Sequence, residues 1–187
     1  MVPRLAWIVL AAGVLWGAVA LEGGAGPSIA ADGLVLGTDG LHTVDGEPFT
    51  GLALTYERSA EHGHVLVERV RYVDGLRHGL RMRWYPDGSV LSRTAFEEGK
   101  RHGVADAFWE NGNRRSIATY RDGRLHGTAT QWYREGMPFK RRQLSDGREE
   151  GLQRAWRRDG TLYANYEARG GRNYGLNNAE LCSMVGE

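Results

Sequence analysis

Three histidines stand at equal spacing, and such a series could hold metal ions or transfer protons. His78, His102 and His126 recur every 24 residues. A shared zinc ion would need a nitrogen from each of two histidines about 2 Å away. If 24 residues form two neighbouring strands, equivalent histidines lie roughly 10 Å apart, because paired strands are about 4.8 Å apart. The series therefore predicts structural histidines in turns.

The other reactive side chains form no recognisable catalytic set. A nucleophile needs a base within hydrogen-bond reach and a third group that orients the base. Adjacent acids on a strand point to opposite faces and cannot act as one pair. Two nearby histidines lack a carboxylate or thiol partner that would complete a metal site. We therefore predict no catalytic residue, no metal ligand and no cofactor, and expect that the chain is not an enzyme. The residues considered are His62, His64, Glu97-Glu98 and Glu149-Glu150.

Cys182 is the only cysteine of the chain. A single cysteine cannot form an internal disulfide, and a leftover thiol in an oxidising compartment indicates burial or pairing with another chain. We expect Cys182 to be buried in a terminal cap. A reactive thiol, or a homodimer linked through Cys182, remains the alternative.

A repeat of 24 residues must position all these groups. Three series of glycines keep this spacing without slippage, and a period of this length indicates a repeat architecture. Large aromatic residues stay in register with the glycines. The glycine series are Gly75, Gly99, Gly123, Gly147 and Gly171; Gly79, Gly103, Gly127, Gly151 and Gly175; and Gly88, Gly112, Gly136 and Gly160.

Each copy has the pattern of two strands and two turns. Leu80, Met82 and Trp84 alternate with polar or amphipathic residues, which is the period of a strand. Pro86-Asp87-Gly88 has the composition of a tight turn. So little chain remains between strands that sequential antiparallel pairing follows. We predict an all-β fold, an elongated single-layer antiparallel β-meander of about ten strands, preceded by an N-terminal apolar helix.

Two aromatic series are predicted to lie on opposite faces of this sheet. A single layer is stabilised mainly by cross-strand neighbours, each contributing roughly 0.2–1 kcal/mol. The first series is expected to form a structural ridge, and the second an interaction face, because exposed aromatic patches usually mark binding sites. The ridge comprises Trp84, Phe108, Trp132 and Trp156, and the interaction face comprises Tyr85, Trp109, Tyr133 and Arg157.

Residues 1–31 differ in kind from the rest of the chain. Arg4 precedes an uncharged apolar run over residues 5–21, and Ala18-Val19-Ala20 resembles a cleavage site, with a second candidate near Ser28-Ile29-Ala30. This pattern is typical of a secretory signal peptide. We expect export to the periplasm or the cell exterior. The alternative is an uncleaved segment that anchors the protein in the membrane and is its only membrane contact.

The remaining chain divides into three parts. Residues 32–74 are predicted to form a degenerate repeat that caps the sheet, because terminal repeats are usually atypical. Extra residues there are expected to enlarge the first hairpin loop around residues 59–64. Residues 75–171 hold four repeats, and residues 172–187 form a partial repeat and C-terminal cap.

Charge narrows the choice of partner. The formal net charge is +1, whereas a general nucleic-acid binder usually carries a basic excess. We therefore expect no nucleic-acid partner. Pairs such as Arg114-Arg115 and Arg141-Arg142 are interpreted as a solvated sheet face, with a local anion-binding stripe as the alternative.

The repeated phrase resembles the MORN repeat in its bacterial variant form. The resemblance rests on residues 72–79, on Trp84-Tyr85-Pro86-Asp87-Gly88, and on their copies across roughly residues 44–176. The standard repeat carries a further glycine where this chain has Arg81, Ala105, Ala129 and Gln153. The resemblance implies an elongated, twisted, single-layer antiparallel sheet that serves binding or scaffolding.

The sequence and the resemblance together favour one function and leave two alternatives. The favoured function is an exported scaffold that binds a protein or an envelope component through one sheet face. The first alternative is an antitoxin-like inhibitor of a toxin–antitoxin pair, which rests on labels given to some bacterial variant members. The second is a lipid- or glycan-binding module. The identity of the partner does not follow from the sequence.

Overall fold

The computed structural model describes residues 26–176, and most of this region consists of strands joined by short turns. The predicted all-β, mostly antiparallel sheet of many strands is confirmed, whereas the expected N-terminal helix lies outside the described residues. A short 3-10 turn, η1, spans Ala31–Gly33. The strands are β1 (Ser28–Ala30), β2 (Val35–Leu36), β3 (His42–Val44), β4 (Glu47–Pro48), β5 (Gly51–Ser59), β6 (Gly63–Val73), β7 (Leu76–Arg77), β8 (Gly79–Trp84), β9 (Val90–Glu97), β10 (Lys100–Phe108), β11 (Arg114–Arg121), β12 (Arg124–Leu125), β13 (Gly127–Trp132), β14 (Pro138–Ser145), β15 (Arg148–Glu149), β16 (Gly151–Trp156), β17 (Leu162–Arg169) and β18 (Arg172–Leu176).

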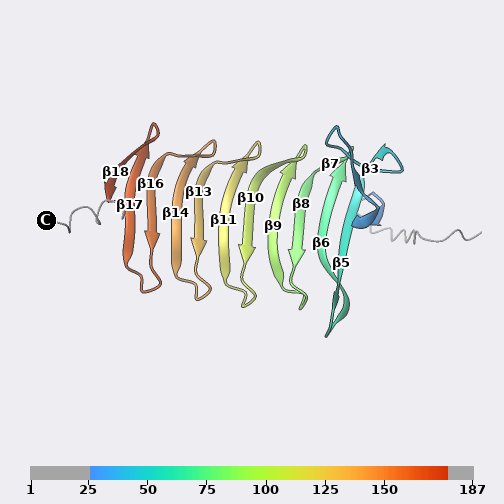
Figure 1. The fold of residues 1–187 in the computed structure, drawn as a ribbon, viewed down its shortest axis with the longest axis horizontal. Helices are drawn as coiled ribbons and strands as arrows, with labels where there is room; N and C mark the ends of the chain where they lie inside the picture. The colour runs from blue at the N-terminus through green and yellow to red at the C-terminus, as the bar shows by residue number, and fades with distance from the viewer. Residues whose placement is uncertain (1–25, 177–187) are drawn as a thin grey trace, which may run out of the picture.

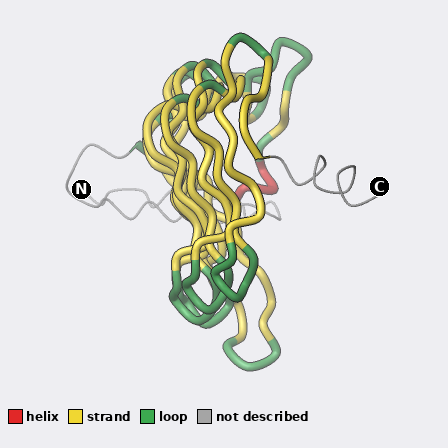
Figure 2. Tube along the Cα trace, turned by 90° about the vertical axis from the view of Figure 1, so that its left-hand side faces the viewer, coloured by secondary structure: helices red, strands yellow, loops and turns green. Residues whose placement is uncertain are grey.

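The large sheet follows the order of the chain. From β5 onward the hydrogen-bonded order is β5-β6-β8-β9-β10-β11-β13-β14-β16-β17-β18, with short β7, β12 and β15 pairing beside this path. Figure 1 shows these strands as one row, and Figure 2 shows them superposed when the row is viewed end-on. The sheet has 15 strands, more than the ten expected, because the two-residue strands and β1 also join it.

The strands end in turns at the top and at the bottom of Figure 1, and these two rows of turns are called the upper edge and the lower edge of the sheet. The upper edge is built from two-residue turns. Asp74 and Gly75 have φ of 48° and 77°, and two successive positive φ angles characterise the type I′ turn that suits the twist of a hairpin. Glycine tolerates this region without a Cβ penalty. The same pairing recurs at Asp45-Gly46, Glu98-Gly99, Asp122-Gly123, Asp146-Gly147 and Gly170-Gly171.

These turns also join one repeat to the next. The amide of Gly99 donates to the Arg77 carbonyl at 2.9 Å, and the amide of Gly123 donates to the Arg101 carbonyl at 2.8 Å. The amide of Gly75 donates in the same way to the Phe49 carbonyl at 2.9 Å. Each turn is therefore stacked on the preceding copy, so that the repeat spacing is fixed by backbone hydrogen bonds.

The N-terminal cap, residues 26–50, departs from the predicted antiparallel meander. β1 pairs with β5 in parallel, and β2, β3 and β4 form a separate three-stranded sheet. Ile29, Ala31, Leu34 and Val44 of the cap pack on a buried cluster of Phe49, Ala53, Val70 and Tyr72. These residues lie in or next to residues 32–74, the segment that was predicted to be a degenerate repeat and cap.

The first hairpin corrects the expectation of an enlarged loop around residues 59–64. The extra residues lengthen β5 and β6, which remain paired up to Ser59 and Gly63. The hairpin therefore projects beyond the other turns (Figure 1). Residues such as Val65 and Val67 favour extended structure. Continued pairing of β5 with β6 therefore stabilises this segment more than an open loop would.

Strand alternation gives the sheet two faces. The Ala105 face carries Tyr72, Phe96, Ala105, Leu144 and Ala168, and the Leu80 face carries Leu80, Val104 and Leu152. Tyr72, Phe96, Leu144 and Ala168 are buried, and each occupies the end of a return strand. These positions form one apolar column across the repeats, close to the upper edge.

Candidate interaction surfaces

The predicted interaction face lies at the lower edge of the sheet, where its aromatic side chains link neighbouring repeats. The Tyr85 hydroxyl donates to the Phe108 carbonyl at 2.9 Å. Trp109 Nε1 donates to the Trp132 carbonyl at 3.3 Å, and the Tyr133 hydroxyl donates to the Trp156 carbonyl at 3.0 Å. All three donors are half-buried. Their polar ends therefore stabilise the repeat stack. The Arg115 guanidinium carbon lies 5.5 Å from the Trp109 centroid and that of Arg158 lies 5.4 Å from the Tyr133 centroid, so that this series presents aromatic rings together with arginines.

The fourth member of this series, Arg157, is exposed. Its guanidinium carbon lies 5.9 Å from the Tyr163 ring centroid. In the other three repeats the donor bonds to the carbonyl of the residue 23 positions later. For position 157 that residue lies outside the described residues. Arg157 thus shares the position of the three aromatic residues, but contacts a ring of its own repeat.

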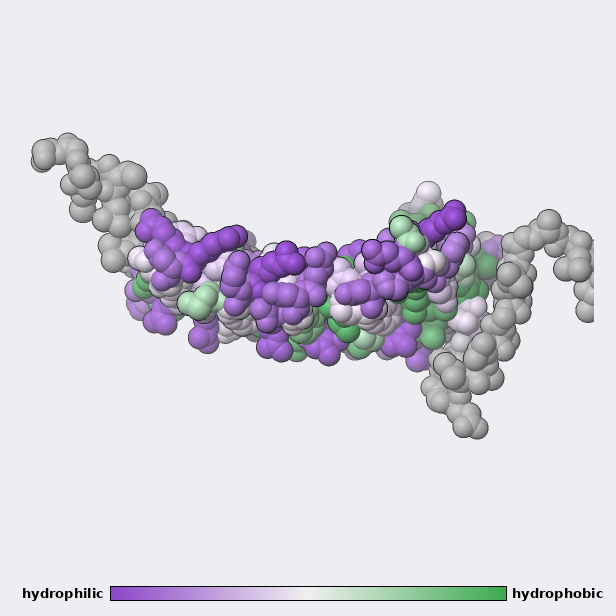
Figure 3. Space-filling model, turned by 90° about the horizontal axis from the view of Figure 1, so that it is seen from below, coloured by the Kyte–Doolittle hydropathy of each residue, from purple (hydrophilic) through white to green (hydrophobic). Residues whose placement is uncertain are grey.

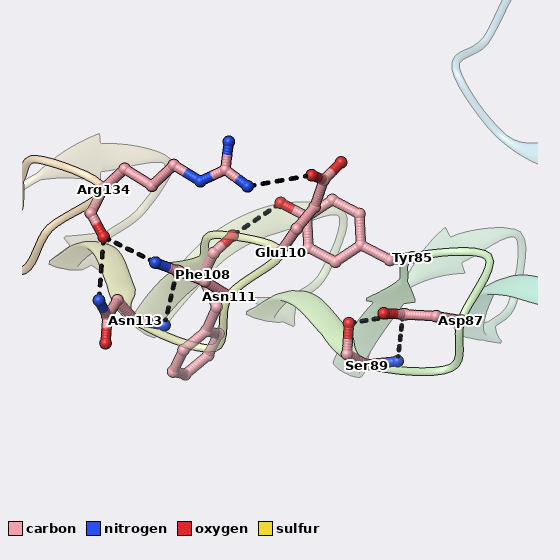
Figure 4. Close-up of polar contacts among 8 residues, drawn as sticks. All are labelled: Tyr85, Asp87, Ser89, Phe108, Glu110, Asn111, Asn113 and Arg134. Atoms are coloured by element: carbon pink, nitrogen blue, oxygen red, sulfur yellow. Dashed lines mark hydrogen bonds and ion pairs between the residues drawn. The ribbon is translucent and has the colours of Figure 1, made fainter.

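The lower turns are fixed by side-chain hydrogen bonds (Figure 4). Asp87 Oδ1 accepts from the Ser89 hydroxyl at 2.6 Å and from the Ser89 amide at 2.9 Å. Both hydrogen bonds stabilise the ionised carboxylate and therefore lower the pKa of Asp87, and the bond from the hydroxyl contributes most. The next two turns are joined because the Asn111 and Asn113 side chains both donate to the Arg134 carbonyl at 2.9 Å. Figure 3 shows the resulting lower edge as a mostly hydrophilic surface.

The predicted structural ridge supplies the acceptors for these links. Trp84, Phe108, Trp132 and Trp156 are all half-buried, and the last three accept the aromatic donors through their carbonyls. Arginines cover two of the rings: the Arg93 guanidinium carbon lies 5.2 Å from the Phe108 centroid, and that of Arg114 lies 5.9 Å from the Trp132 centroid. Cation–π contacts of this kind contribute about 0.5–1 kcal/mol at exposed sites.

The repeated histidines lie beside acids of the upper turns. His126 Nδ1 is 3.3 Å from Asp146, and His102 Nδ1 is 3.5 Å from Glu97 and 3.8 Å from Asp122. His78 is exposed, and its amide donates to the Arg71 carbonyl at 2.9 Å. Within residues 26–176 there is no group of three or more His, Cys, Asp or Glu side chains that could hold a metal ion. His62 and His64 are exposed in the first hairpin, and Cys182 lies outside the described residues.

The Leu80 face combines apolar and charged side chains. Leu80, Val104 and Leu152 are 44%, 51% and 44% exposed and belong to the same position of three repeats. Asp106, buried on the same face, accepts from Arg93 Nε at 3.0 Å and also pairs with its terminal nitrogen. The hydrogen bond to Asp106, followed by the attraction between the two charges, raises the pKa of Arg93.

The Ala105 face holds a shallow trough over β7 to β11 that the repeat pattern did not indicate. Its floor consists of serine, threonine and alanine side chains, and its arginines are Arg77, Arg81, Arg101 and Arg115. Two of the arginines repeat after 24 residues, but the next equivalent position is Leu125. Because the arginine position is not kept in the third repeat, the 24-residue period did not predict this cluster.

Tyr166 is expected to make the protein sensitive to alkaline pH. Its hydroxyl donates to Glu149 at 2.7 Å, and burial, followed by this bond to a carboxylate, raises its pKa to about 12 from 10.0. Because the folded state favours the neutral phenol, the stabilisation is complete below pH 10 and is lost as the pH rises towards 12. Absorbance titration should show one tyrosine that ionises late in the folded protein.

The matched test replaces Tyr166 or Tyr163 by phenylalanine. Tyr166→Phe should remove the late ionisation and flatten the loss of thermal stability between pH 10 and about 12. Tyr163→Phe should retain both features. Identical alkaline behaviour of the two variants would show that the contact with Glu149 does not govern this transition.

Comparison with known proteins adds no assignment. No protein-family model and no curated protein matches the sequence. Among the described residues, no helix has the length and apolar character needed to cross a membrane.

Proposed function

We propose that this chain is an exported, non-enzymatic binding module that captures a protein or envelope component through its sheet. In this proposal the sheet is an elongated single-layer meander of 24-residue hairpins of the MORN type, and the lower-edge rings of Tyr85, Trp109 and Tyr133 contact the partner. The repeated sequence phrase and the strand order support the assignment. Binding requires only that the sheet presents these rings at a fixed spacing.

One observation carries the proposal. The buried core cluster involves residues 49–72 and the cap that packs on them. Over β8 to β17, by contrast, all strands belong to one hydrogen-bonded sheet, and the second sheet of the described residues, β2-β3-β4, lies in the cap. A sheet that presents partly exposed aromatic and arginine side chains offers a large surface for a partner. The links from Tyr85, Trp109 and Tyr133 to the next repeat hold their rings in place, which reduces the entropy lost on binding.

Export is supported by the N-terminal sequence. Residues 5–21 have the apolar run and small-residue site of a signal peptide. Of the two candidate cleavage sites, the one after Ala20 leaves β1 intact, whereas cleavage after Ala30 would remove the whole strand that pairs with β5. We therefore propose a mature chain that begins at Leu21.

Site-specific photo-crosslinking in cells tests the binding function. An aromatic photo-crosslinking amino acid placed at position 85, 109 or 133 keeps a ring at the lower edge. Each position should form a covalent adduct with the same partner. Position 56 is the matched control, because Tyr56 is 51% exposed but belongs to the first hairpin. Adducts at position 56 alone, or at none of these positions, would refute the proposed surface.

A further inference from the structure

The near-neutral total charge conceals a separation of charge within the sheet. Most lysines and arginines of the described chain lie on strands, whereas acids concentrate in the turns at the two edges. Asp74, Asp122 and Asp146 lie in upper turns, and Asp87 and Glu110 lie in lower turns. The middle of the sheet is therefore basic and its upper turns are acidic, whereas the lower turns hold both signs, with Glu110 and Glu135 paired to Arg134 and Arg158.

The trough on the Ala105 face has arginines whose charge is not balanced locally. The only acidic residue among its lining residues is Asp106, whose carboxylate pairs with Arg93 on the opposite face. Arg81 pairs with Glu68 at 2.6 Å, while its Nε is buried without a hydrogen-bond partner. Arg77, Arg101 and Arg115 have no ion pair with a carboxylate among the contacts of the described residues.

Three of these arginines are already held in place by aromatic rings. The guanidinium carbon of Arg101 lies 5.0 Å from the Tyr120 centroid, and its Nη1 donates to the Tyr120 hydroxyl at 3.0 Å. Arg77 lies 5.8 Å from the Phe96 centroid, and Arg115 lies 5.5 Å from that of Trp109. A guanidinium fixed in this way loses little freedom when it binds a carboxylate, and its planar fork matches that group.

The floor of the trough restricts the shape of an occupant. Ser92, Thr94, Ala105, Ala107 and Ala118 project little from the sheet, so a slim chain can approach the backbone. Arg77 and Arg101 occupy equivalent positions two strands apart, roughly 10 Å along the sheet. An extended peptide rises about 3.3 Å per residue, so that acidic residues three positions apart match this spacing.

We propose that the arginine trough binds an acidic peptide segment in extended conformation, with carboxylates against Arg77 and Arg101. A bilayer or a long polyanion would extend beyond the trough and meet the carboxylates of the upper turns, such as Asp74 and Asp122. A short peptide lying along the row of strands stays between these edges. The inference rests on the proposed binding function and deepens it by naming the chemistry of the partner.

Fluorescence anisotropy with a defined probe tests the trough directly. The probe is a fluorescein-labelled twelve-residue peptide of Glu-Gly-Ser repeats, titrated with the full chain at low salt. The Arg77→Gln/Arg101→Gln variant should bind at least about tenfold more weakly. Arg121→Gln/Arg141→Gln removes the same charge from exposed positions on the opposite face and should bind nearly as well as the unaltered protein. Arg77→Lys/Arg101→Lys should lie between the two, because lysine keeps the charge without the fork.

The outcomes separate binding in the trough from unfolding and from unspecific charge attraction. Thermal melting of each variant shows whether lost binding reflects lost folding, and the lysine variant keeps the test decisive if the glutamine variant unfolds. No binding of the probe, an equal loss in the control variant, or equal binding of a Gln-Gly-Ser probe would overturn the inference. Tighter binding of single-stranded DNA or of phosphatidylglycerol vesicles would overturn it as well. Photo-crosslinking at the lower edge does not involve Arg77 or Arg101, so the broader binding function can fail or survive independently.

Discussion

Replacing Gly75 by alanine is expected to lower the free energy of unfolding by roughly 2–5 kcal/mol. Gly75 has φ of 77°, a region that costs an L-residue roughly 1–2 kcal/mol. An added Cβ would also lie 2.9 Å from Leu41 Cβ and 3.0 Å from the His42 carbonyl oxygen. Relieving such overpacking typically costs about 1–3 kcal/mol. The cap would have to move away from the first repeat, although the His42 amide donates to the Gly75 carbonyl at 2.8 Å.

Gly123→Ala is the matched control, because Gly123 occupies the same turn position two repeats further on. Its φ is 82°, but the nearest atom to an added Cβ is Lys100 Cβ at 4.0 Å. Only the backbone cost of roughly 1–2 kcal/mol should remain. Urea denaturation of both variants measures the difference. Equal destabilisation would show that the cap does not pack on the Gly75 turn as the structure describes.

The turns were predictable from the sequence because their cause is local. A residue with positive φ favours glycine whatever its tertiary surroundings, so the three glycine series marked both edges of the sheet. Gly88, Gly103 and Gly123, one from each series, all have positive φ. Strand alternation and short connections then determined which strands are neighbours, as the pairing of β8 with β9 illustrates.

The cap was not predictable in the same way, because its contacts are unique. Ser28–Ala30 carries no repeat signal, and its parallel pairing with β5 depends on the surface that Ala53 and Val70 present. The link from Tyr85 to the Phe108 carbonyl was also missed, since spacing alone does not show whether an aromatic side chain lies flat or reaches a neighbour. The formal charge of +1 likewise concealed the separation of arginines on strands from acids in turns.

Deleting one complete repeat, residues 100–123, is expected to leave a folded protein. The deletion removes β10 and β11 together and places Gly99 before Arg124, so the Glu98-Gly99 turn replaces Asp122-Gly123. The Tyr85 hydroxyl would then face the Trp132 carbonyl in place of that of Phe108. In a stack of this kind each repeat contacts only its neighbours, so the loss is limited to one repeat and one interface. The sheet should shorten by about 10 Å, twice the strand spacing.

A smaller deletion is expected to do far more damage. Removing residues 100–111 takes out β10 alone and leaves β9 and β11, which run in the same direction. Parallel neighbours need a crossover of about a dozen or more residues, whereas the remaining connection is Glu98, Gly99, Gly112 and Asn113. Circular dichroism and small-angle scattering should show a cooperative, shortened sheet for the longer deletion and loss of the native transition for the shorter one. If the longer deletion unfolds, or the shorter one folds, the stability of the sheet does not reside in interchangeable hairpins.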